Sequence, residues 1–183
     1  MTYEVSLKIV TIVLGFLVSF KGLLSLLFSK PLRIALKGLA RNYPIGVIFM
    51  GMAIAWSLWL VSFVDLAEYS GLRHGIMLGI FLLGGATIIF LPDFLIARAL
   101  GVLLLLGAEV LLSAAFPVKS PSRYVITFLA YFWAILGMIF VAMPYRFRDL
   151  LFWFCATERR FLGWCWGKLL FGLGLLILGF FVY

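Results

Sequence analysis

Residues 95–116 read LIARALGVLLLLGAEVLLSAAF, an apolar run long enough to cross the hydrocarbon core of a bilayer as a helix. Five more runs of this kind occupy residues 7–28, 45–64, 75–91, 124–143 and 161–182. Such a run, without two-residue alternation, can satisfy its backbone amides in lipid only as a helix. The sequence therefore predicts an all-α integral membrane protein with six transmembrane helices in a single domain, residues 1–183.

The composition excludes a soluble globular enzyme. Hydrophobic residues make up 66% of the 183 positions and charged residues 12%, whereas a soluble domain has about half and about a quarter. Fifteen basic against seven acidic residues give a net charge of +8. Because the basic residues gather beside the apolar runs, we expect anionic lipid headgroups, and not nucleic acid, as their partners.

The connectors after the first, third and fifth spans each open with a proline, and two of them are predicted to be amphipathic helices lying on the membrane surface. The first carries apolar residues at helical spacing beside a basic stripe of Arg33, Lys37 and Arg41. The second repeats the apolar spacing beside Arg146 and Arg148. We expect these five basic side chains to contact lipid headgroups.

The distribution of basic residues orients the chain. Those at the three proline-started connectors are Lys30, Arg33, Lys37, Arg41, Arg98, Arg146, Arg148, Arg159 and Arg160, against Lys8, Arg73, Lys119 and Arg123 on the other side. The positive-inside rule places the richer side in the cytoplasm and both termini outside the cell membrane. The six spans would then form three helical hairpins joined on the cytoplasmic side, which would constitute a parallel repeat.

Ionisable groups inside a span require an explanation, because lipid burial costs about 2.5–3.5 kcal/mol at the helix centre. Glu109 lies in the outer half of the fourth span. One hypothesis makes it a proton or cation site. The other makes it a neutral or locally bonded carboxyl, with Ser113 one helical turn further on as its partner.

Three basic residues complete the candidate ion site. Arg98 shares a helix face with Glu109 but lies about 16 Å away along the axis, so it is expected to reach Asp93 or a lipid phosphate instead. Lys21 and Lys168 lie about 10 Å inside the first and last spans. They form either a shared polar spot near the cytoplasmic face or two independent side chains that extend to the interface.

No metal or cofactor is expected, although bound lipids are. His74, the single histidine, has Asp65 and Glu68 in the same loop, but their spacing is not diagnostic of a metal site. No second axial group accompanies His74, so ligation of a haem or pigment is also disfavoured. Cys155 and Cys165 lack the spacing of a zinc site or a disulfide framework.

Small residues at four-residue spacing, Gly75 with Gly79 and Gly163 with Gly167, predict close helix packing either within the chain or with another protein. Catalytic constellations and phosphate loops are missing from the sequence, so we do not expect an enzyme. The favoured hypothesis is a non-catalytic membrane subunit that packs against and stabilises a larger complex. The alternative is a small proton- or ion-coupled transporter or channel, with Glu109 as the titrating group.

Overall fold

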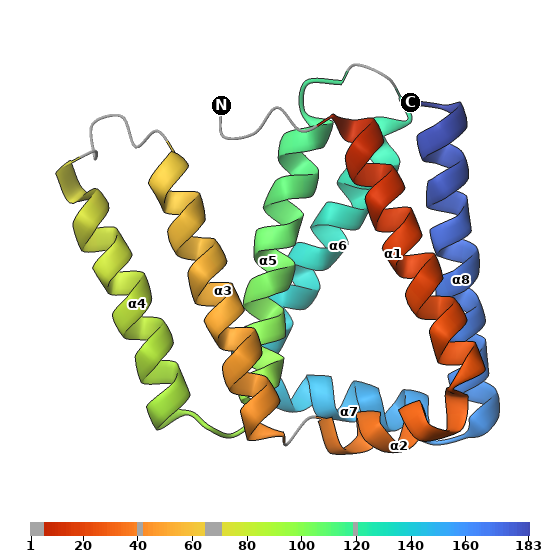
Figure 1. Cartoon of the computed structure of the whole chain (residues 1–183), viewed down its shortest axis with the longest axis horizontal. Coiled ribbons are helices and arrows are strands. Elements are labelled where there is room, and N and C mark those ends of the chain that lie inside the picture. Colours follow the sequence, from red (N-terminus) through yellow and green to blue (C-terminus); the bar gives the residue numbers. More distant parts are fainter. Residues whose placement is uncertain (1–5, 40–41, 65–70, 119–120) are drawn as a thin grey trace.

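The computed structural model describes residues 6–39, 42–64, 71–118 and 121–183, and the secondary structure of these residues is helical throughout. In chain order the helices are α1 (Leu7–Leu27), α2 (Ser29–Leu39), α3 (Tyr43–Phe63), α4 (Arg73–Phe90), α5 (Leu95–Ala115), α6 (Arg123–Ala142), α7 (Pro144–Cys155) and α8 (Glu158–Phe181) (Figure 1). Six of them, all except α2 and α7, are long and apolar enough to cross a membrane. The all-helical class and the six long apolar helices predicted from the sequence are thus confirmed.

Local capping explains where two of the spans begin. The Asn42 side chain accepts a hydrogen bond from the backbone N–H of Ile45 at 3.3 Å, and a proline follows in the first turn of α3. The Thr157 hydroxyl accepts one from the backbone N–H of Arg160 at 3.4 Å at the start of α8. Both helices therefore begin slightly before their apolar runs, within the polar connector.

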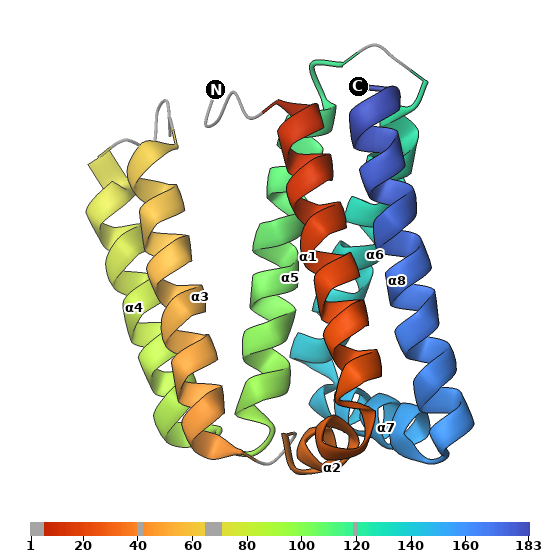
Figure 2. The ribbon, with the colours of Figure 1, turned by 45° about the vertical axis from the view of Figure 1, so that its right-hand side comes forward.

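The six spans pack in an order different from the predicted hairpins. The most extensive contacts join α1 to α8 and α5 to α6, while α3 packs against α5 and α4 against α3. The spans joined by α2 stand apart along their length, and those joined by α7 separate toward the connector end (Figures 1 and 2). The reason is geometric: α2 and α7 run across the end of the bundle for about 16–18 Å, whereas packed helices need only about 8–10 Å between axes.

Glycines set the two closest helix contacts. A Cβ at Gly101 of α5 would lie 2.8 Å from the carbonyl oxygen of Gly137 in α6, and the reverse distance is the same. Gly15 and Gly172 allow the same close approach between α1 and α8, where a Cβ on either would lie 2.5–3.0 Å from backbone atoms of the other helix. These backbones can approach only because the side chains are missing.

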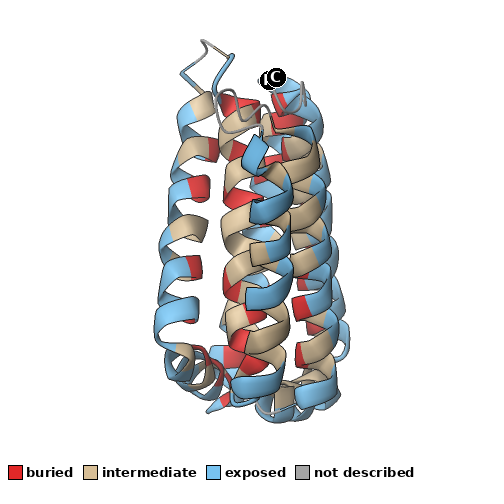
Figure 3. Ribbon diagram, turned by 90° about the vertical axis from the view of Figure 1, so that its left-hand side faces the viewer, coloured by how far each residue is buried: buried red, intermediate tan, exposed pale blue. Residues whose placement is uncertain are grey.

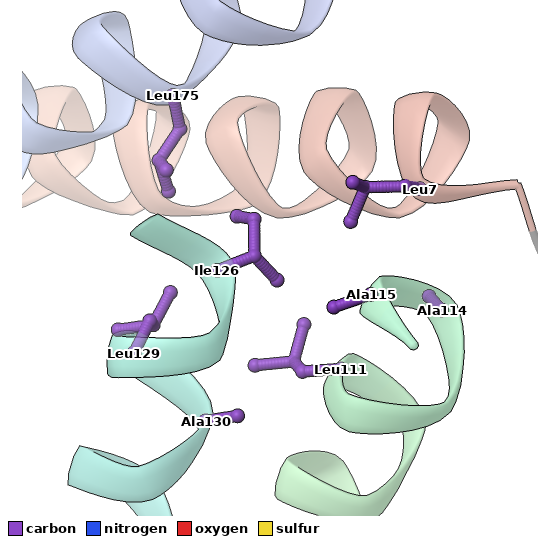
Figure 4. Close-up of a cluster of buried hydrophobic side chains, with 8 residues drawn as sticks. All are labelled: Leu7, Leu111, Ala114, Ala115, Ile126, Leu129, Ala130 and Leu175. Carbon is purple, nitrogen blue, oxygen red and sulfur yellow. The ribbon is translucent and has the colours of Figure 1, made fainter. Parts of the chain in front are cut away.

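Two buried clusters hold the pairs together. At the end of the bundle away from α2 and α7, side chains of α1, α5, α6 and α8 meet around Leu111 and Ile126 (Figure 4). At the connector end, Phe140 of α6 and Phe147 of α7 pack edge to face with their ring centroids 5.2 Å apart. By contrast, α4 contributes no buried residue (Figure 3).

The α1–α8 contact generates a paired prediction. In Gly172→Val the new Cβ would meet the backbone nitrogen of Ser19 at 2.5 Å and its hydroxyl closer still, so we expect a loss of about 1–3 kcal/mol from overpacking. Thermal unfolding in detergent, followed by circular dichroism, should show a lower melting temperature. Gly174→Val is the control, because a Cβ there has no neighbour within 4 Å; equal melting temperatures for the two variants would contradict the packing described.

Candidate functional site

Among the described residues of the spans, Ser19 and Glu109 have buried side-chain oxygens without a hydrogen-bond partner, and Glu109 is the ionisable one. Its Oε2 atom is buried and has no hydrogen-bond partner among the residues that the structure describes. The Ser113 hydroxyl donates instead to the carbonyl oxygen of Val110 at 3.0 Å, so the expected local bond between Glu109 and Ser113 does not form. A buried carboxyl without a partner is energetically costly, and binding a proton or a cation would reduce that cost.

The Arg98 side chain donates hydrogen bonds just beyond the C-terminal end of the preceding helix, α4. Its guanidinium Nη1 donates to the carbonyl oxygens of Leu91 and Asp93 at 3.1 and 3.3 Å. These carbonyls follow the last turn of α4, where a positive charge is favourable. Arg98 thus reaches back toward Asp93, as expected, but to its backbone; Glu109 remains about three turns further along α5.

Lys168 is fixed between the first and last spans. Its Nζ atom donates to the Ser25 hydroxyl at 3.1 Å and lies 3.7 Å from the ring centroid of Trp164, a cation–π contact. The Ser25 hydroxyl in turn donates to the carbonyl oxygen of Lys21 at 2.6 Å. The structure therefore brings the positions of Lys21 and Lys168 together in one polar spot.

An apolar cavity of about 800 Å³ adjoins this spot, between α1, α6 and α8. Its walls include Leu14 and Val18 of α1 and a stripe of aromatic residues on α6, among them Phe128 and Phe132. Lys168 is the one charged residue of the lining. The sequence analysis did not find this cavity, because it depends on α6 leaning away from α1 and α8 (Figure 1); the aromatic residues at four-residue spacing in α6 were the available signal.

The basic residues of α2 and α7 have different surroundings. Arg33 donates to the carbonyl oxygens of Cys155 and Ala156 at 2.8 and 2.9 Å, which joins α2 to the C-terminal end of α7. Arg148 pairs with Asp149 at 2.7 Å. The remaining predicted headgroup contacts are Lys37, which is exposed, Arg146, which lies over the ring of Tyr145, and Arg41, which falls outside the described residues.

The predicted glycine contacts do not occur within the described part of the chain. A Cβ at Gly75, Gly79, Gly163 or Gly167 would have no neighbour within 4 Å. Close packing at these positions, if it occurs, involves another molecule. The glycines that do pack internally lie on the facing sides of α1 with α8 and of α5 with α6, together with Gly46 of α3 against α5 and Gly84 of α4 against α3.

The metal and thiol candidates show little that points to chemistry. His74 is exposed, and Asp65 and Glu68 lie outside the described residues. Within the described ranges no three histidine, cysteine or acidic side chains gather as metal ligands. Cys155 and Cys165 are free thiols in one buried cluster with Phe161, and burial raises the pKa of the Cys155 thiol, which lowers its reactivity.

No family model, characterised protein or solved structure matches the chain. The candidate site is therefore interpreted from its own residues. These are the buried carboxyl of Glu109, the polar spot of Lys168 and Ser25 with its adjoining cavity, and the unburied surface of α4.

Proposed function

We propose that the chain crosses the cell membrane six times, with α2 and α7 lying at the cytoplasmic surface and both termini outside. Both short helices run across the same end of the bundle (Figures 1 and 2). That end also holds the excess of lysine and arginine found in the sequence. The exposed residues of α2 include Lys30 and Lys37, which suits a helix lying among anionic headgroups.

Cysteine labelling tests this orientation. Gly71→Cys lies at the outer start of α4 and Lys37→Cys in α2, and both positions are exposed. A membrane-impermeant maleimide should label Gly71→Cys in intact cells and Lys37→Cys only after permeabilisation. The native thiols, Cys155 and Cys165, are fully buried and provide a low background; the reverse labelling pattern would invert the proposed topology.

Within this orientation we propose that the protein is a non-catalytic subunit of a larger membrane complex. The observation that carries the proposal is α4: none of its 18 residues is buried, and α3 is its main neighbour (Figure 3). Spans of a self-contained bundle bury at least one face against their neighbours. Gly75 and Gly79 leave one side of α4 open to close approach by a helix of another chain.

The subunit proposal is tested by extraction from native membranes in a gentle detergent. We expect the wild-type chain to leave the membrane in a particle larger than a monomer, together with companion proteins. Gly79→Leu should release it as a monomer, because the bulky side chain blocks close approach at α4. Gly174→Leu, at an open position on α8, should leave the particle intact. A wild-type monomer without companions would overturn the proposal.

A second candidate function rests on Glu109. Its buried, unbonded Oε2 atom favours a group that exchanges a proton or cation during transport. Arg98 and the two span lysines would then contribute positive charge on the cytoplasmic side of that group.

Flux through liposomes decides between the two functions. For a transporter, Glu109→Gln should abolish movement of protons or cations while the melting temperature stays unchanged or rises, since the amide has nearly the same shape and no charge to bury. For a subunit, the wild-type protein alone should produce no flux, and Glu109→Gln should be silent in both assays.

A further inference from the structure

The polar spot at Lys168 and the apolar cavity beside it form one continuous surface. On α1, Leu14, Val18, Lys21 and Ser25 recur at intervals of four, three and four residues, which places them on a single helix face. Leu14 and Val18 line the cavity, and Ser25 holds Lys168. Lys21 is exposed on this same face. Two lysines and a hydroxyl thus lie at one end of the apolar cavity.

Neither lysine has a counter-charge among the residues that the structure describes. Throughout the described ranges, the one ion pair is that of Arg148 with Asp149, in α7. Lys168 has only neutral partners, a hydroxyl and an aromatic ring. A cation held inside a span without an anion is expensive, and Lys21 brings a second positive charge to this face, so the spot is complementary to an anion.

The polarity of the surface matches a lipid that stands along the membrane normal. A side chain on a helix leans toward the helix N-terminus, and for α8 this is the connector end, where Trp164 and Ser25 receive the Lys168 ammonium. From there the cavity extends past Phe132 to Tyr124, at the opposite end of α6. Its volume of about 800 Å³ lies within the usual range for a small-molecule site, about 300–1,000 Å³.

We propose that this surface binds an anionic phospholipid, with its phosphate at Lys168 and Lys21 and one acyl chain in the cavity between α1, α6 and α8. A phosphate offers enough oxygens to accept from two ammonium groups together. The walls are hydrocarbon and aromatic side chains, which suit an acyl chain. With the proposed orientation, the phosphate end of this site lies in the cytoplasmic leaflet. The choice of ligand does not depend on that orientation.

Native mass spectrometry of the full-length chain, stripped of lipid in detergent, tests the site. The probes are dioleoylphosphatidylglycerol and its zwitterionic counterpart dioleoylphosphatidylcholine. We expect one phosphatidylglycerol per chain to bind more tightly than phosphatidylcholine. Lys168→Met should weaken phosphatidylglycerol binding about fivefold, the usual contribution of one lysine to an anionic lipid contact, with little effect on phosphatidylcholine. Lys8→Met, on the same helix as Lys21 but at its opposite end, is the matched control and should bind as wild type.

Further variants separate the contribution of the lysine charges from that of the cavity. Val18→Trp, which fills the cavity, should weaken the binding of both lipids. If Lys168→Met does not fold, Lys21→Met decides, because this exposed side chain can be removed without loss of packing. Unchanged phosphatidylglycerol binding in the lysine variants would overturn the proposal. Displacement of phosphatidylglycerol by equimolar oleate would also overturn it, since the site would then select a single-chain carboxylate.

Discussion

Apart from one atom each in Ser19, Arg73 and Glu109, the buried polar side-chain atoms described in this structure have a partner from the chain itself, as the hydrocarbon of a membrane requires. Three hydroxyl groups in the spans find this partner within their own helix: Thr11, Ser57 and Thr87 each donate to the carbonyl oxygen four residues earlier. At the ends of helices, arginine side chains supply the donors. Arg33, Arg73, Arg98 and Arg123 donate to carbonyl oxygens at or just beyond the C-terminal ends of α7, α3, α4 and α5, respectively. These contacts satisfy carbonyls that would otherwise lack donors and complement the helix dipoles.

The sequence was sufficient to predict the spans, because membrane thickness imposes a length and a composition that few other folds share. It was insufficient to predict their pairing. Gly75 with Gly79 has the spacing typical of close helix packing, yet faces open space, whereas Gly15 and Gly172, in the helices at the two ends of the chain, meet across α1 and α8. Which glycines pack depends on the rotation and tilt of each helix, and spacing along a single helix carries no such information.

The candidate site, too, could be predicted from the sequence only in part. The equal depth of Lys21 and Lys168 follows from counting residues, but it fitted a shared polar spot and two independent side chains equally well; the bond between Lys168 and Ser25 was not predictable from it. The cavity depends on long-range geometry: α7 crosses from α6 to α8 and separates their ends there, while the cluster around Ile126 joins α6 to α1 and α8 at the other end. No local sequence pattern predicts that α6 and α8 separate at one end and meet at the other (Figure 1).

The proposed partner surface and lipid site lie on opposite sides of the molecule, α4 at one edge and the α1–α8 pair at the other (Figure 1). The α5–α6 pair separates them and holds most of the buried core. Because internal packing transmits strain only through contiguous contacts, and α4 is connected to the rest mainly through α3, substitutions at Gly79 and at Lys168 should act independently. Glu109 lies on α5, in the pair that separates the two surfaces, and its Oε2 atom has no hydrogen-bond partner among the described residues through which it could link them.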